Sequence, residues 1–429
     1  MSLPAGPKII PYLHSLKWRG RFLEFLDYCA QNYGDTFTFQ IVGSRPFVVV
    51  SHPQAIKEIF TAPLGHFDSG KNNRVFQPLL GKNSLLLLDG ASHQRQRQLL
   101  IPPFHGERLQ SYSQVICDIT RAEIKHLVIN TPFIVRSPIQ LLTLRIILEV
   151  VFGSGQGEQV QMIDRCLTSL IDSFISPLPW KRLTFPRRKQ QLDELIYAEI
   201  YQRKLQLDSS RTDILSLLLT IEDESGQKMT DEEIRDELIT LVMAGYETTT
   251  TAVLWALYWI ALLPEVQEKL QRELDCLGLT PSPNEIIQLP YLTAICLETL
   301  RIYSITGFTF DRIVQVPFKV MDYQFEPGTV LSPCAYLTHQ REDIYTDSKQ
   351  FKPERFLQHQ FSPYEYYPFG GGNRRCIGIA FAQIEMKLIL ANIFSSIHLS
   401  VVDSRPIRPV PRGITLTTPL NLQLVAINR

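Results

Sequence analysis

The chain of 429 residues has no excess of charge of either sign and no pattern of paired cysteines. Lysine plus arginine and aspartate plus glutamate number 43 each. This balance argues against nucleic acid as the main partner, because neutralising phosphates requires a basic face. The seven cysteines are odd in number and include no C-x-x-C pair, so they indicate neither a disulfide framework nor a zinc site. We expect a reducing compartment and mostly buried cysteines.

The chain also lacks the sequence features of multidomain, secreted and membrane-anchored proteins. It has no Gly/Ser-rich linker, no low-complexity tract and no internal repeat. Neither a signal peptide nor an apolar run of about 18 residues follows Met1, so the sequence, taken as complete, predicts a cytoplasmic, soluble protein without a transmembrane anchor. Hydrophobic residues make up 45% of the chain, enough to bury a large core. We expect one domain over residues 1–429, and a monomer.

Hydrophobic periodicity predicts a mainly α-helical fold with small β-sheets (α+β). Apolar residues at i, i+3 and i+4 predict helices near 92–100, 107–127, 138–152, 160–175, 187–207, 231–263, 264–276, 290–303 and 377–395. Alternating patterns predict β-rich segments near 36–50, 313–335 and 414–427, of which the first and last read as hairpins, the last broken by Pro419. The helical core is therefore expected over 90–303 and 377–395. The longest helix, 231–263, begins with a capping box of Thr230 and Glu233 and ends before Pro264.

One cysteine stands in unusual surroundings. Cys376 follows three consecutive glycines, Gly370 to Gly372, which occur where a backbone turns tightly or approaches another group closely. A helix is predicted from about Ile377, which puts Cys376 at its N-terminus. There the unpaired N–H groups and the positive end of the helix dipole favour thiolate over thiol. The pattern indicates a cysteine that acts as a thiolate.

The stretch from Phe369 to Gly378 resembles the haem-binding loop of the cytochrome P450 family of haem-thiolate monooxygenases. The five fixed positions of F-x-x-G-x-R-x-C-x-G are occupied by Phe369, Gly372, Arg374, Cys376 and Gly378. The likeness is to soluble bacterial members, cyanobacterial ones among them. It implies haem b as cofactor, Cys376 as axial ligand of the iron and Arg374 as the partner of a haem propionate. Phe369 and Gly370 are expected beside the haem.

A second resemblance lies in Glu298, Arg301 and Arg355. The first two form E-x-x-R on one helix face, and the third belongs to Lys352-Pro353-Glu354-Arg355-Phe356. By spacing alone, E-x-x-R also describes a surface ion pair worth under about 1 kcal/mol. The family resemblance implies instead a buried structural network that holds the cysteine loop in place.

The predicted helix 231–263 carries a third motif. Ala244-Gly245-Tyr246-Glu247-Thr248-Thr249 resembles the oxygen-activation pattern A-G-x-[DE]-T-T. A mid-helix glycine and a run of threonines disfavour the helix locally, and such conflicts tend to mark function. The resemblance implies that Ala244 and Gly245 leave room for O2 and substrate, and that Thr248 and Glu247 pass protons. A small-residue contact between helices is the alternative.

Further residues are assigned by the same resemblance. His93 and Arg97, at i,i+4, and Arg312 match positions that bind haem propionates, although a solvated basic face is the alternative. Candidate pocket residues are Phe67, Phe76, Leu86, Met243, Phe308 and Phe310. Ser304-Ile305 stands where many relatives have Pro-Pro, so substrate analogies are unsafe. The basic, aromatic segment 180–189 leaves peripheral membrane contact open beside an ordinary solvated loop.

Together these features predict a monooxygenase that inserts one oxygen atom from O2 into a lipophilic substrate such as a fatty acid or terpenoid. No G-x-G-x-x-G, flavin domain or cluster-ligating cysteine set is present, so electrons are expected from a separate ferredoxin or flavodoxin with its reductase. Two alternatives use the same haem: a peroxide-driven peroxygenase or an isomerase, and a non-catalytic sensor or carrier. The Glu247-Thr248 pair argues against both.

Overall fold

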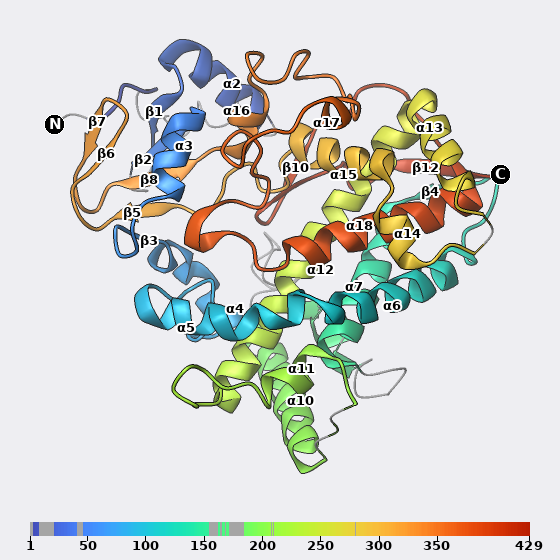
Figure 1. Ribbon diagram of the computed structural model, residues 1–429, viewed down its shortest axis with the longest axis horizontal. Coiled ribbons are helices and arrows are strands. Elements are labelled where there is room, and N and C mark those ends of the chain that lie inside the picture. The colour runs from blue at the N-terminus through green and yellow to red at the C-terminus, as the bar shows by residue number, and fades with distance from the viewer. Residues whose placement is uncertain are drawn as a thin grey trace. The chain divides into compact units, whose positions relative to one another are not determined.

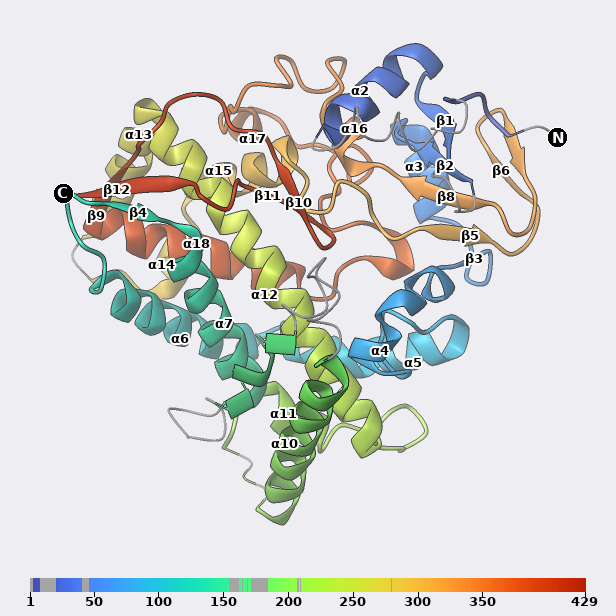
Figure 2. The same ribbon diagram turned by 180° about the vertical axis from the view of Figure 1, so that it is seen from behind.

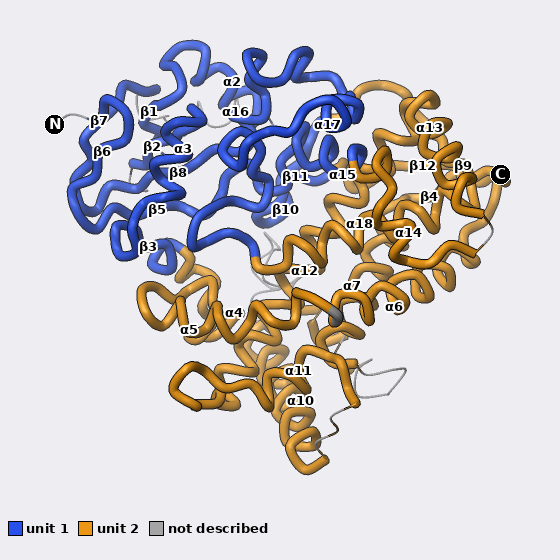
Figure 3. Tube along the Cα trace, in the orientation of Figure 1, with its two compact units in different colours: residues 1–72, 294–376, 408–417 blue, residues 73–293, 377–407, 418–429 orange. Residues whose placement is uncertain are grey.

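The computed structural model describes residues 3–7, 21–40, 46–153, 162–163, 165–167, 169–170, 184–206, 208, 210–278 and 280–429. The chain divides into two compact units, each assembled from three separate segments (Figure 3). Unit 1 comprises residues 1–72, 294–376 and 408–417, and unit 2 comprises residues 73–293, 377–407 and 418–429. The single domain expected over residues 1–429 stays a prediction, and each unit is described by itself.

Unit 1 is built on a five-stranded sheet with strand order β1-β2-β8-β5-β3 (Figure 1). The strands of unit 1, which also include the two-stranded sheets β6-β7 and β10-β11, are β1 (Thr36–Phe39), β2 (Phe47–Val50), β3 (Phe67–Asp68), β5 (Arg312–Val314), β6 (Phe318–Val320), β7 (Tyr323–Phe325), β8 (Val330–Pro333), β10 (Val410–Arg412) and β11 (Thr415–Thr417). Its helices are α2 (Phe22–Tyr33), α3 (Pro53–Phe60), α16 (Ala335–His339) and α17 (Arg355–Gln358), with the 3-10 turn η3 (Gly372–Arg374). β2 and β8 pair in parallel, with Val48 opposite Leu331, and both side chains are fully buried.

Unit 2 is mainly helical. Its helices are α4 (Gln77–Leu80), α5 (Gly90–Leu100), η2 (Pro102–Phe104), α6 (Glu107–Ile124), α7 (Arg136–Phe152), α10 (Phe185–Leu205), α11 (Ile214–Leu218), α12 (Asp231–Leu262), α13 (Pro264–Asp275), α14 (Pro283–Ile287) and α18 (Ile379–Ser396). A three-stranded sheet of order β4-β12-β9 joins β4 (Pro132–Ile134), β12 (Gln423–Asn428) and β9 (Ile397–Val401). Two further helices, η1 (Gly70–Phe76) and α15 (Pro290–Ile302), run across the boundaries between segments.

The long helix α12 forms as the sequence predicts. Thr230 and Glu233 make a complete capping box, in which the Thr230 amide donates to the Glu233 carboxylate at 2.7 Å and the Glu233 amide donates to the Thr230 hydroxyl at 3.2 Å. Pro264 opens α13, whose axis turns by 106° from that of α12. α12 packs against α7 and α18, as Figure 2 shows, and most of its side chains are buried. It is therefore the central helix of unit 2.

The predicted hairpin over 414–427 and the predicted helix over 160–175 have different outcomes. The hairpin predicted over 414–427 is wrong, because β11 pairs with β10 while β12 pairs with β4 and β9, so Pro419 separates two different sheets. The predicted helix 160–175 lies largely outside the described residues, as do residues 180–183 of the basic segment, whose remainder begins α10. The mainly helical α+β class is confirmed.

Among the described residues, one helix, α18, is long and apolar enough to cross a membrane. The helices α12 and α13 meet the same criteria only when they are taken together as a bent pair. Over half of α18 is buried inside the protein. Core helices of soluble proteins pass the same test, so this is weak support for a span.

Candidate functional site

The predicted site residues fall into both units. In unit 1, the loop that ends at Cys376 folds back on itself, and the Cys376 amide donates to the Phe369 carbonyl at 3.0 Å. Its glycines are required sterically: a Cβ on Gly371 would lie 2.0 Å from the Phe60 ring, and Gly372, at φ +63°, would place a Cβ 2.6 Å from the Phe60 carbonyl oxygen. The α3 end therefore fixes the path of the loop to the cysteine.

Exposure distinguishes Cys376 from most of the other cysteines. Cys29, Cys117, Cys296 and Cys334 are buried, and burial raises the pKa of both Cys29 and Cys334 to about 12. Burial disfavours the thiolate, so Cys29 and Cys334 are core residues. Cys376 is exposed and lies just before Gly378, the N-cap of α18. The structure thus leaves this sulfur accessible to an external group.

Two guanidinium groups beside the loop form a setting for an anion. Arg312 is 2% exposed, and its Nη2 donates to the Gly371 carbonyl at 3.0 Å while its Nη1 donates to the Phe310 carbonyl at 2.6 Å. Burial, followed by the positive charge of Arg374, lowers the pKa of Arg312. A negatively charged carboxylate near both groups would offset this repulsion, as a haem propionate does.

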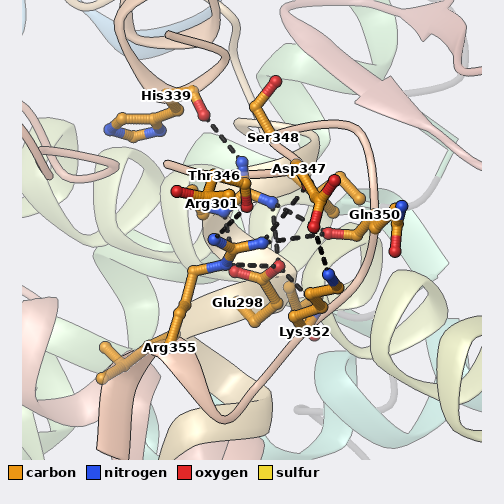
Figure 4. Close-up of polar contacts among 12 residues, drawn as sticks. Glu298, Arg301, His339, Thr346, Asp347, Ser348, Gln350, Lys352 and Arg355 are labelled. Carbon is orange, nitrogen blue, oxygen red and sulfur yellow. Dashed lines mark hydrogen bonds and ion pairs between the residues drawn. The ribbon is translucent and has the colours of Figure 1, made fainter. Parts of the chain in front are cut away.

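The residues Glu298, Arg301 and Arg355 lie together in a network of charged side chains and backbone carbonyls (Figure 4). Glu298 and Arg301 are fully buried and form a two-point pair, with Nε–Oε2 at 2.7 Å and Nη2–Oε1 at 2.8 Å. The Arg355 Nε donates to Glu298 Oε1 at 3.1 Å, and the Lys352 amide donates to the same oxygen at 2.8 Å. Arg301 also donates to the His339 carbonyl at 2.7 Å. The predicted role of this network in holding the cysteine loop in place stays a prediction.

The departure at Ser304 has a defined place in unit 1. Ser304 is buried, and its hydroxyl lies 3.0 Å from Nδ1 of His339. The other ring nitrogen, Nε2, accepts from the Tyr367 amide at 3.0 Å, so Nδ1 carries the proton and donates to Ser304. Burial, and then the charge of Arg301, lower the pKa of His339 to about 3, which keeps the ring neutral. Through His339, Ser304 is therefore linked to the backbone amide of Tyr367, two residues before Phe369.

In unit 2, the centre of α12 separates two kinds of polar side chain. Ala244 and Thr248 share one face; Ala244 is exposed, and the Thr248 hydroxyl donates to the Ala244 carbonyl at 2.5 Å. Glu247 is 8% exposed and pairs with Arg136 of α7, itself 5% exposed. The Glu247 carboxylate is therefore held toward α7, whereas the hydroxyl of the next residue, Thr248, is partly exposed.

The contact with α7 also accounts for Gly245. A Cβ there would lie 2.9 Å from Cδ1 of Ile147, so the absent side chain faces α7 and admits Ile147 rather than leaving an open side of the helix. The hydroxyls of Thr143 and Thr250, 2.7 Å apart, add a buried polar contact between the same helices. The alternative of a small-residue helix contact holds for Gly245.

The remaining predicted residues are placed as follows. His93, 3% exposed, and Arg97 lie one turn apart on α5 of unit 2. In unit 1, Phe67 packs edge-on against Phe318 with ring centroids 4.9 Å apart, and Phe308 packs with the buried core around β1 and α2. Phe310, Phe76, Leu86 and Met243 are partly exposed. Pocket roles for Phe67, Phe76, Leu86, Met243, Phe308 and Phe310 stay predictions.

Comparison with known proteins decides the family. A family model described as Cytochrome P450 matches residues 4–425. Cytochrome P450 135B1 of Mycobacterium tuberculosis is 33% identical over 423 residues, which cover 95% of this chain and 88% of that protein. Cytochrome P450 135A1 of the same organism is also 33% identical, over 96% of this chain and 92% of its own length. The chain belongs to the cytochrome P450 family.

A solved structure supports the same fold. Cyanobacterial CYP120A1, in its complex with retinoic acid, aligns over the whole of both chains with a TM-score of 0.87 and 24% identity. The family model and the two relatives confirm the resemblance found in the sequence. As a cytochrome P450, the protein is an oxidoreductase of the haem monooxygenase class with haem b as its cofactor. The exposed thiol and the two guanidinium groups of unit 1 fit that cofactor.

Several residues of the P450 site were not predicted. Arg136 pairs with Glu247 across 111 residues of sequence, and no local pattern points to it. His339 is fully buried between Arg301, Ser304 and Tyr367; the sequence pointed to Arg301 and Ser304 but not to His339. In both cases the partner lies far away in the chain, where spacing gives no information.

Proposed function

We propose that this cytochrome P450 inserts one oxygen atom from O2 into a lipophilic small molecule, such as a fatty acid or a terpenoid. The observation that carries the proposal is the pairing, on α12, of the partly open Thr248 hydroxyl with the adjacent carboxylate of Glu247, buried against Arg136. A haem protein that only carried or sensed a ligand would have no need of an acid beside a hydroxyl at this place.

Haem supplies the redox chemistry of O2 when it is bound. Cys376 would hold the iron as a thiolate, with its loop kept in place by Gly371, Gly372 and the Glu298 network. Arg312, Arg374, His93 and Arg97 would bind the propionates, because each offers a cationic or N–H donor. Phe369, Gly370 and Ala244 would lie against the macrocycle.

Proton delivery is the proposed task of Thr248 and Glu247. The Thr248 hydroxyl donates its own hydrogen to the Ala244 carbonyl, so its oxygen is left to accept a hydrogen bond and to hold a water or a reacting group. Glu247 would exchange protons with bulk water when its pair with Arg136 opens. A closed pair holds the carboxylate against Arg136 and away from the reaction, and an open pair lets it act as a relay.

The substrate class and the partners rest on side-chain chemistry. Leu86, Met243, Phe76 and Phe310 are apolar and partly exposed, which suits a lipophilic molecule. A ferredoxin or flavodoxin with its reductase would supply electrons, since no flavin or iron–sulfur motif occurs in the chain. We propose a cytoplasmic, soluble monomer.

The test is turnover of a lipophilic panel with reduced ferredoxin under isotopically labelled O2. One labelled oxygen atom per product, with one pair of electrons consumed, is the expected result. Product formed only with added peroxide would make the protein a peroxygenase. An isomerised, unlabelled product would make it an isomerase, and ligand binding without any product would make it a carrier or sensor.

A further inference from the structure

The loop Gly81–Leu87 is tied to the first turns of α12 by two neighbouring carboxyl groups, Asp236 and Glu237. Oδ2 of Asp236 accepts from the backbone amide of Asn83 at 2.9 Å and from its side-chain amide at 3.1 Å. The hydroxyls of Ser84 and Thr240, 2.8 Å apart, add a third tie. All of these groups belong to unit 2. The loop therefore owes its position to α12.

The fit at the start of this loop is close. Gly81 has φ +91°, a conformation that side chains rarely adopt, and a Cβ there would lie 2.0 Å from Oδ1 of Asp236. The Asp236 carboxylate occupies the space that any larger residue would need. Arg235 pairs with Oδ1 of Asp236 at 2.6 Å and with Asp193 of α10, so the Asp236 charge is compensated.

Glu237 makes the deepest of these ties. It is fully buried, and its Oε1 accepts from the Leu85 amide at 2.7 Å. On its other side lies Gln96 of α5, also buried, whose side chain opposes the rise in the pKa of the carboxyl. Within the described part of the chain, Oε2 of Glu237 and Nε2 of Gln96 have no well-aligned hydrogen-bond partner.

The charges around Glu237 do not stabilise its ionised form. The charged or titratable side chains on the surrounding elements include Glu233, Arg235 and Asp236 of α12, His93, Arg95 and Arg97 of α5, Lys82 of the loop and Asp193 of α10. Lys82, Arg95 and Arg235 are each paired with a carboxylate other than Glu237. Burial first, and then the charges of Asp236 and Glu233, raise the pKa of Glu237 to about 8.

We propose that Glu237 is a positioning residue that holds Gly81–Leu87 on α12 only in its protonated form, so that ionisation releases the loop and weakens substrate binding. A buried carboxylate gains water only if the loop moves away, because Leu85 and Gln96 cover it. The loop carries Leu86, a candidate substrate contact, and continues toward α5 with His93 and Arg97. The substrate part of this inference rests on the proposed function; the loop release does not.

The first experiment measures amide hydrogen exchange in Gly81–Leu87 of the haem-loaded protein at pH 7 and pH 9, corrected for intrinsic exchange. The wild-type loop should lose about tenfold in protection over this interval, because ionisation becomes dominant above a pKa of about 8. Glu237→Gln, which keeps the acceptor for Leu85 without titrating, should show less than about a twofold change. The exposed Glu232→Gln on the same helix should behave like wild type.

The second experiment follows substrate affinity by the spectral shift of the haem over the same range, with a fatty acid as probe. Wild type should bind about tenfold more weakly at pH 9, and Glu237→Gln should not. Equal loop protection at both pH values, or a loss that persists in Glu237→Gln, would overturn the proposal. Should Glu237→Gln not fold, the wild-type exchange alone decides. A pH-dependent loop in a protein that binds no fatty acid would count against the proposed substrate class and leave the role of Glu237 standing.

Discussion

Glu298 in unit 1 and Glu237 in unit 2 are both fully buried, yet they have opposite surroundings. Glu298 contacts two guanidinium groups, those of Arg301 and Arg355, and also a backbone amide. Glu237 has one backbone amide, and its neighbours on α12 include two further acidic residues. Burial excludes water from both, so each side chain depends on the charged and polar groups around it.

We therefore predict different roles for the two side chains: Glu298 holds structural elements in place, whereas the contacts of Glu237 change with pH. Glu298 contacts two cations, and its network links α15 to the His339 carbonyl of α16 and to the Lys352 amide; we predict that it holds the segment before Cys376 in place. A carboxyl group without a cation stays protonated near neutral pH, and the contacts around it depend on pH. Glu385 of α18 resembles Glu237, since burial raises its pKa to about 8, opposed by the nearby Thr249 side chain.

Removing a cation from the Glu298 network should have the largest effect. Arg301→Ala leaves Glu298 buried beside one guanidinium, which costs about 3–5 kcal/mol, so we expect little folded, haem-loaded protein. Haem content per chain and the free energy of unfolding measure this. Arg272→Ala, which breaks a pair at 3.7 Å whose side chains are over 60% exposed, is the control and should change stability by under about 1 kcal/mol. Normal haem content in Arg301→Ala would reduce the network to an ordinary ion pair.

A smaller effect on stability, with a large one on chemistry, is expected at the centre of α12. Thr248→Val removes the hydroxyl that donates to Ala244, at about 0.5–1.5 kcal/mol. The proton-transfer step should slow by about 10²–10⁴-fold, so most reductant would yield hydrogen peroxide instead of product. The ratio of product to reductant consumed measures this.

Thr250→Val is the matched control on the same helix. Its hydroxyl also bonds a carbonyl four residues back, at 2.8 Å, but it faces Thr143 of α7. We expect lower stability with an unchanged ratio of product to reductant. Equal ratios in Thr248→Val and wild type would assign Thr248 a structural role.

The third effect is a pH dependence of stability that arises from Glu385. Its pKa is raised to about 8 in the folded protein, from 4.5, so between these values the folded state holds a proton that the unfolded state has lost. The contribution of this bound proton to the free energy of unfolding is complete below the unfolded pKa. It falls as pH rises toward 8, by up to about 1.4 kcal/mol per pH unit. Glu385→Gln should remove that part of the slope in unfolding experiments from pH 5 to 8. An unchanged slope would mean that the carboxyl is ionised throughout.

The same comparison explains which features were predictable. Periodicity located α12 and α18, and short motifs located Cys376 and the Glu298 network, because residues close in sequence carry those signals. The strand pairing of residues 414–427 was predicted wrongly, since β11 pairs with β10 just before it, whereas β12 takes the distant β4 and the earlier β9 as partners. The contacts of Glu237 with Leu85, over 152 residues, and of Glu247 with Arg136, over 111, have no local signature.

The central claim is that the exposed Cys376 binds haem iron as a thiolate. The most direct measurement is the absorption spectrum of the reduced, CO-bound protein, for wild type and for Cys376→His. Thiolate ligation predicts a strongly red-shifted Soret band in the wild type and its loss in Cys376→His, whether or not that variant retains haem. A wild-type band at the position typical of a histidine-ligated globin would contradict the assignment.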